Sequence, residues 1–135
     1  MRKTSFAAAL LAATLLHSPL SALADEARVS FAEPQDGAVL SSPFKLRFAV
    51  SGMQVKPAGD MSEGSGHHHL LINHEPLKAG ESVPFDETHL HFGKGQTETE
   101  LKLAPGKYKL TLQFANGAHQ SYGPAAAQTI SITVK

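Results

Sequence analysis

Histidines form the most chemically distinctive feature of this sequence, in two short segments that each place imidazoles two residues apart. The first segment is Gly66-His67-His68-His69-Leu70-Leu71-Ile72, and the second is His89-Leu90-His91-Phe92. In a β-strand, residues i and i+2 project from one face, so each segment presents a pair of imidazoles. Neutral imidazole is the commonest protein metal ligand. The spacing therefore predicts a metal site on a β scaffold.

Alternation along the two segments assigns each histidine to a face. The apolar residues between and beside the histidines are expected to face a core, which turns the flanking imidazoles to the opposite face. The candidate ligands are His67, His69, His89, His91 and, from a loop after a predicted turn, His119. Three further residues are candidates for a supporting shell around the ligands: His68, His74 and Asp86.

The donor types narrow the choice of metal. The chain has no cysteine, which excludes thiolate sites and iron–sulfur clusters. Imidazole sites suit Cu(II), Zn(II) and Ni(II), whereas thioether sulfur favours Cu(I). Met53 and Met61 precede the histidine triplet and are candidate thioether donors, although Met more often fills a core. We expect a copper or zinc ion, with copper favoured.

Three classes of function remain open on these residues. The first is a metal-binding domain for binding, buffering or delivery. The second is a binding module of the cell envelope whose histidine face recognises something other than a metal, and the third is a small metalloenzyme with an open position that activates water. A solvated or pH-sensing histidine cluster is the alternative without a metal. Nothing in the sequence demands an enzyme, because neither a G-x-S-x-G motif nor a phosphate-binding glycine loop is present.

The N-terminal segment, Met1 to Ala24, has the composition of a secretory signal peptide. Arg2 and Lys3 precede an apolar run, and Ala22-Leu23-Ala24 forms a small-x-small cleavage site. The apolar run is too short for a transmembrane helix. The sequence thus predicts a soluble periplasmic protein whose single domain covers residues 25–135.

The charge of this domain limits its partners. Without Arg2 and Lys3, ten basic side chains face twelve acidic ones, a net charge of about −2 with histidine neutral. No basic stripe is present, so nucleic acid is not expected as a partner. The expected partners are a metal ion and, as a second candidate, another periplasmic protein.

The apolar pattern has a period of two along most of the domain. Phe44, Leu46, Phe48 and Val50 alternate with polar or small residues, and Pro34-Gln35-Asp36-Gly37 and Asn116-Gly117 are turn signals. The pattern predicts an all-β domain, an immunoglobulin-like antiparallel β-sandwich of about seven strands, with a small barrel as the alternative. Two predicted loops, residues 56–65 and 75–87, flank the histidine triplet.

The same segments resemble a family of small periplasmic bacterial domains of unknown function. The resemblance begins at Phe31-Ala32-Glu33-Pro34 and includes GHHHLLI, residues 66–72, and HLHFGKGQTE, residues 89–98. It continues through Leu103-Ala104-Pro105-Gly106 to His119 and Tyr122-Gly123-Pro124. Some members of this family carry a rod-shape-determination label. The resemblance implies a single exported domain and supplies no activity.

Overall fold

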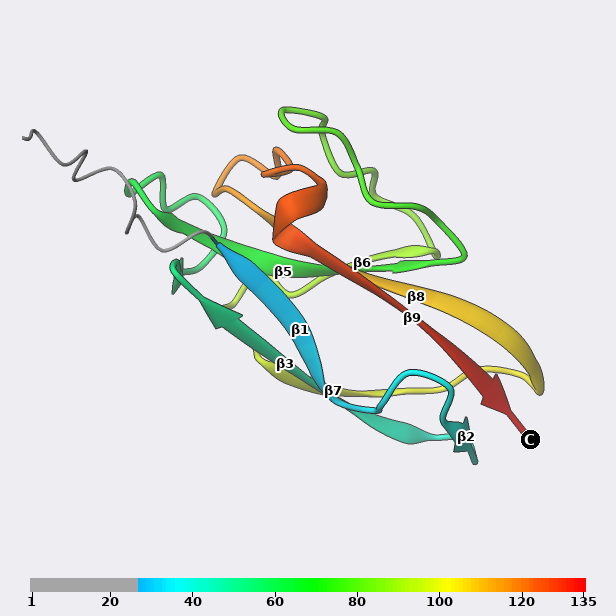
Figure 1. The fold of residues 1–135 in the computed structure, drawn as a ribbon. Coiled ribbons are helices and arrows are strands. Elements are labelled where there is room, and N and C mark those ends of the chain that lie inside the picture. Colours follow the sequence, from blue (N-terminus) through cyan, green and yellow to red (C-terminus); the bar gives the residue numbers. More distant parts are fainter. Residues whose placement is uncertain (1–26) are drawn as a thin grey trace, which may run out of the picture.

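The alternating pattern produces strands that pack as two sheets (Figure 1). The structure, a computed structural model, describes residues 27–135. The predicted signal peptide, residues 1–24, lies outside the described residues. Within them the chain forms nine strands and one short 3₁₀ helix, η2 (Pro124–Ala126), which confirms the predicted all-β sandwich. The immunoglobulin-like assignment stays a prediction.

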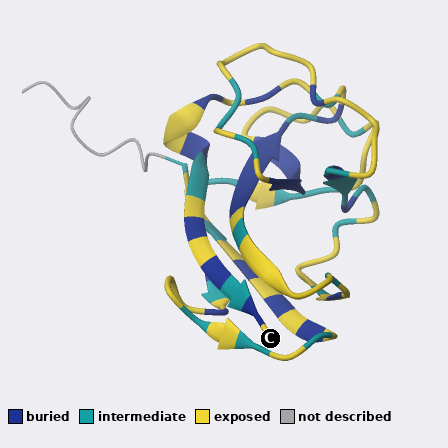
Figure 2. Ribbon diagram, turned by 90° about the vertical axis from the view of Figure 1, so that its right-hand side faces the viewer, coloured by how far each residue is buried: buried dark blue, intermediate teal, exposed yellow. Residues whose placement is uncertain are grey.

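The smaller sheet has three antiparallel strands in the order β1-β3-β7. They are β1 (Arg28–Glu33), β3 (Phe44–Ser51) and β7 (Glu98–Leu101). Along β3, Phe44, Leu46 and Phe48 are buried while the residues between them are exposed. Bands of buried and exposed residues along the strands are visible in Figure 2. The period of two therefore places one face of this sheet against the core.

The larger sheet has six strands and carries the histidines. Its order is β2-β9-β8-β5, and both β4 and β6 pair with β5. Its strands are β2 (Val39–Leu40), β4 (Gln54–Val55), β5 (Ser65–Ile72), β6 (His89–His91), β8 (Gly106–Ala115) and β9 (Ala127–Val134). Two pairings, β2 with β9 and β4 with β5, are parallel. The expectation of about seven antiparallel strands was therefore incomplete, because two-residue strands are too short to show alternation.

A single apolar core fills the space between the sheets. Its buried residues include Phe31, Phe48, Leu70, Phe114 and Ile132. They come from β1, β3, β5, β8 and β9, so every long strand contributes its inward face. Among residues 27–135, no helix has the length and apolar character needed to cross a membrane.

Strand β5 differs from the others because all eight of its residues are buried. Its inward face meets the core, and its outward face is covered by residues 73–88, which we call the cover loop. Leu77 N–H donates to Gln113 Oε1 (2.9 Å), the Thr111 hydroxyl donates to the His74 carbonyl (2.8 Å), and Gly80 N–H donates to the Ser121 carbonyl (2.8 Å). The outward histidines of β5 are therefore shielded from water, which alternation alone did not predict.

His68 is the one histidine of β5 that enters the sandwich core. Its ring lies 5.2 Å from that of Phe48 and 5.1 Å from that of Phe114, measured between centroids. The side chain is fully buried, and neither ring nitrogen has a hydrogen-bond partner. Burial, aided by the charge of His67, lowers the pKa of His68 to about 4. A buried donor and acceptor without partners destabilise the folded state.

Replacing this ring with an apolar side chain should stabilise the metal-free protein. We expect His68→Leu to raise the free energy of unfolding at pH 7 by about 1–3 kcal/mol, the usual cost of an unpartnered buried polar group. Urea denaturation followed by circular dichroism measures this change. A destabilised variant would show that the ring nitrogens bond to buried water.

The pH dependence of this difference provides the control. Because the pKa of His68 is lowered in the folded state, the unfolded chain binds the proton first as the pH falls. Wild type should therefore lose stability relative to His68→Leu between about pH 6.5 and pH 4. A difference that is constant over this range would contradict the assignment of a neutral core histidine.

Candidate functional site

Three histidine rings converge on the outward face of the larger sheet. His67 and His69 project from β5, and His119 comes from the turn that follows β8. His67 Nε2 lies 3.0 Å from His119 Nδ1, which lies 3.4 Å from His69 Nε2. One ring nitrogen from each residue lies within 4.8 Å of the other two. Among residues 27–135, these three form the one group of this kind that can hold a metal ion.

The pairing of β5 with β8 brings the three residues together. In the antiparallel register, His67 lies opposite Ala115, the last residue of β8. Gly66 allows this close approach, because a Cβ there would collide with the Ala115 carbonyl oxygen. The start of β5 therefore lies directly beside the turn that carries His119.

The turn after β8 holds His119 in a fixed conformation. Asn116 Oδ1 accepts hydrogen bonds from Ala118 N–H (2.9 Å) and Gln120 N–H (3.0 Å). His119 N–H donates to the Asn116 carbonyl (2.9 Å), and Val83 N–H of the cover loop donates to the His119 carbonyl (2.9 Å). The φ of His119 is 62°, in the left-handed region that non-glycine residues seldom adopt. Such strain at a side chain that points into a cluster is typical of functional sites.

Burial keeps the rings of His67 and His69 neutral. Both side chains are fully buried, while His119 is half-buried. Burial lowers the pKa of His67 to about 4 and that of His69 to about 2, and the neighbouring imidazoles lower both pKa values further. A neutral ring carries one N–H and one lone pair, which is the form that binds metal.

Hydrogen bonding leaves the converging nitrogen atoms of the cluster poorly satisfied. A ring nitrogen either carries a proton and donates, or presents a lone pair and accepts. His119 Nδ1 therefore cannot donate in one of its short contacts, with His67 Nε2 and His69 Nε2, and accept in the other. His67 Nδ1 and His69 Nδ1 are also buried without a partner, but they are not the converging atoms of these rings and give no support to an ion between them. Among residues 27–135, no carboxylate forms a hydrogen bond with the three converging nitrogens that would fix their protons. The arrangement fits an electron-pair acceptor in the middle better than it fits a hydrogen-bond network.

His91 lies at the border of the cluster. It is paired with His69 across β5 and β6, and its ring centroid lies 4.3 Å from that of His69 and 4.9 Å from that of His119. It is not among the residues whose nitrogens lie within 4.8 Å of one another. Phe85 of the cover loop stacks on it, with centroids 3.8 Å apart and an angle of 15° between the rings.

The structure does not bring His89 into the cluster, although His89 shares the outward face of β6 with His91. His89 pairs with Leu71, which lies two residues after His69 along β5. Its Nδ1 lies 2.7 Å from Asp86 Oδ1, and its ring stacks on His74 with centroids 4.3 Å apart. This second group holds His89, His74 and Asp86, together with Thr88, whose hydroxyl bonds to both His74 Nε2 (2.8 Å) and Asp86 Oδ1 (3.0 Å). Asp86 therefore supports His89, and the hydrogen bond from His89 is the main cause of the lowered pKa of Asp86.

The remaining candidates lie elsewhere. His68 is in the core and contacts Phe48 and Phe114, so it does not face the other imidazoles. Met53 packs against the apolar core and Met61 is exposed. Phe85 was not among the residues singled out from the sequence, and an exposed aromatic in a proline-containing loop gives no signal of its stacking partner.

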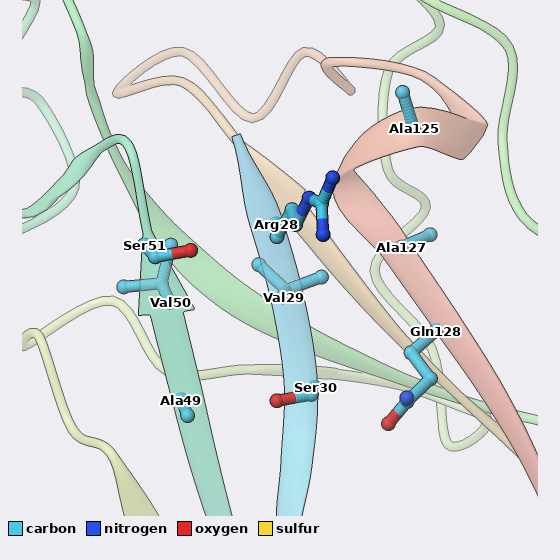
Figure 3. Close-up of a pocket in the computed structure, with 9 residues that line it drawn as sticks. All are labelled: Arg28, Val29, Ser30, Ala49, Val50, Ser51, Ala125, Ala127 and Gln128. Carbon is cyan, nitrogen blue, oxygen red and sulfur yellow. The ribbon is translucent and has the colours of Figure 1, made fainter. Parts of the chain in front are cut away.

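Two shallow hollows on the surface lie away from the histidines. The first, of about 450 Å³, includes Arg28 of β1 and Gln128 of β9 (Figure 3). Gln128 Oε1 accepts a hydrogen bond from Phe31 N–H (2.7 Å), which joins the edge of β1 to the other sheet. The second hollow, of about 410 Å³, lies over β8 and β9 near Tyr108. Neither hollow includes a residue of the cluster.

The fold and the cluster define a β-sandwich domain with a buried histidine triad. Residues 46–135 match a family described as a domain of unknown function, DUF4399, and since the match covers 90 of 135 residues the chain belongs to this family. No curated protein and no solved structure matches the chain. The match confirms membership in a family without an established activity. It begins at Leu46, whereas the resemblance seen in the sequence begins at Phe31. It does not test the histidine motifs or the rod-shape label.

The strained backbone of His119 can be tested separately from its ring. In the metal-free protein we expect His119→Gly to be more stable than His119→Ala by about 1 kcal/mol, because only glycine adopts a positive φ without a steric cost. Both variants lack the imidazole, so their difference isolates the backbone. Urea denaturation measures it. Equal stabilities would mean that the turn relaxes once the ring is removed.

Proposed function

We propose that this protein is a metal-binding domain that uses His67, His69 and His119 as ligands. One observation carries the proposal: three ring nitrogens converge within 4.8 Å of one another, two of their separations being 3.0 and 3.4 Å. In a tetrahedral site with metal–nitrogen bonds of about 2.0–2.1 Å, ligand nitrogens lie about 3.3–3.4 Å apart. The two separations that involve His119, 3.0 and 3.4 Å, are already close to that value.

The donor set supports copper ahead of zinc. All three converging donors are imidazole nitrogens, and the chain contains no cysteine to favour a thiolate site. Nitrogen sites bind Cu(II) more tightly than Zn(II) when geometry does not discriminate. Neither Met53 nor Met61 belongs to the converging group, so the argument for copper rests on nitrogen donors alone.

The place of action in this proposal is the periplasm. It is supported by the signal-peptide composition of Met1 to Ala24. The role there is to bind, buffer or deliver the ion, with another periplasmic protein as the exchange partner. An ion passes from one protein to another by exchange of its imidazole ligands, which breaks no covalent bond of either protein. This role therefore needs no catalytic group beyond the ligands.

Burial argues for an ion rather than a macromolecule as the ligand. His67 and His69 are fully buried, so the surface of a protein or glycan cannot contact them without displacing the cover loop. A metal ion needs only a narrow path past His119, which is half-buried. The recognition-module alternative would instead have to use the outer surface of the cover loop.

Metal stoichiometry tests this proposal. Untagged protein, purified from cells that express the full chain, should contain about one equivalent of metal by elemental analysis. After chelation it should bind Cu(II) in calorimetric titration more tightly than Zn(II). The His69→Ala/His119→Ala variant should lose this binding, whereas the matched control His89→Ala, which removes an imidazole from the same face, should retain it. Weak titration that is equal in all three proteins would refute the proposal.

Export can be checked on the same material. We expect intact-mass spectrometry to give a chain that begins at Asp25, because Ala22-Leu23-Ala24 is the predicted cleavage site. Protein from the periplasmic fraction should show this mass. A mature chain that still begins at Met1 would contradict both the signal peptide and the periplasmic location.

A further inference from the structure

We infer that His91 supplies a fourth imidazole to the ion and that Phe85 covers it, so that the occupied site is closed and has no position for water. This inference rests on the proposed metal site and specifies its coordination. It separates a protein that holds an ion from one that uses the ion to activate water, because an open position is what a catalytic site retains.

The register of the sheet places His91 where a fourth ligand is needed. His91 lies directly opposite His69 in the β5–β6 pair, a relation in which side chains on one face are neighbours. Its ring centroid is 4.3 Å from that of His69 and 4.9 Å from that of His119. His91 therefore lies next to two of the three converging rings, those of His69 and His119.

The unpartnered nitrogen of His91 indicates a missing ligand. His91 Nε2 is buried and has no hydrogen-bond partner, although the rest of the residue is partly exposed. Buried polar atoms in proteins are nearly always satisfied, so an orphan nitrogen beside three others needs an explanation. A metal ion that accepts its lone pair provides one.

A modest movement of the ring completes the site. His91 is outside the group whose nitrogens lie within 4.8 Å of one another, so its ring must turn or shift toward His69 and His119. Phe85 stacks flat on one face of the ring, at 3.8 Å and 15°.

Phe85 is held over the site at both ends of its short segment. On one side, Val83 N–H donates to the His119 carbonyl, 2.9 Å away. On the other side, the Asp86 carbonyl accepts from His89 N–H at 3.2 Å, and Asp86 Oδ1 lies 2.7 Å from His89 Nδ1. Phe85 also meets His119 edge-on, with centroids 5.1 Å apart. Phe85 is 73% exposed, so it is not part of the core, and its ring covers one face of His91 from the solvent side.

Azide distinguishes a closed site from an open one. Untagged protein is loaded with Co(II), whose visible spectrum changes when a small anion joins the coordination sphere. We expect azide to leave the wild-type spectrum unchanged and to shift that of His91→Ala, because removal of the fourth imidazole opens a position. Affinity for Co(II) should fall at least about tenfold in this variant, since loss of a mere supporting group already has that effect. His89→Ala is the matched control for coordination, because it keeps all four proposed imidazoles: its Co(II) spectrum should not respond to azide, although loss of the His89–Asp86 bond loosens one anchor of the Phe85 segment.

The cover is tested by kinetics rather than by affinity. Phe85→Ala keeps all four imidazoles, so its Co(II) spectrum should match that of wild type. Transfer of the ion to an added chelator should be several-fold faster, because the barrier to solvent is removed. Phe85 is exposed and outside the core, so this variant folds even if His91→Ala does not.

The outcomes separate the two levels of the proposal. If wild-type protein binds no Co(II), Cu(II) or Zn(II), the metal site itself is wrong. If wild type binds metal but its spectrum responds to azide as strongly as that of His91→Ala, the site exists and the closed four-imidazole arrangement is wrong. Unchanged transfer rates in Phe85→Ala would overturn the role of Phe85 as the cover.

Discussion

Burial of both faces of β5 is the constraint on which the rest of this structure depends. A strand of a sandwich usually buries one face and exposes the other to water. Polar side chains on the exposed face then stay hydrated and do not destabilise the fold. In β5 the outward face lies under the cover loop, so His67 and His69 lose their contact with water. Their nitrogens must then find partners inside the protein, and the partners within reach are other imidazoles. The convergence of the triad follows from this loss of solvent.

The sequence predicted the elements of the fold well, and physical reasons explain what it missed. Alternation identified the inward residues of β3 and β5 because the two faces of a strand have different surroundings. It also placed the histidine pairs on an outward face. Alternation does not determine register, however, and register is what pairs His91 with His69 and His89 with Leu71. Five candidate ligands could therefore be proposed from the sequence, but the three among them that converge could not be singled out.

The contributions of single loop residues were beyond reach of the sequence for a similar reason. The role of Gly66 depends on a close approach to Ala115, about fifty residues away in the chain. The stacking of Phe85 on His91 depends on how the cover loop is anchored. His68 illustrates the opposite case. Its inward orientation follows from alternation, yet its lack of any hydrogen-bond partner is visible only once its neighbours are placed. Patterns in sequence report which side a residue faces, and not what it meets there.

The separation of the triad along the chain has a consequence for the order of assembly. His67 and His69 are two residues apart in the sequence, but His119 lies about fifty residues later and joins them only when β8 has paired with β5. Under the proposed metal binding, a newly made chain would offer an ion two hosts: the His67/His69 pair, which needs no fold, and the complete triad, which does. An ion caught early by the local pair stabilises the unfolded chain as well as the folded one, which reduces the net stabilisation that binding provides. Under the proposed metal binding, the interval between synthesis of β5 and closure of the β5–β8 pair would be the period in which only the local pair can hold an ion.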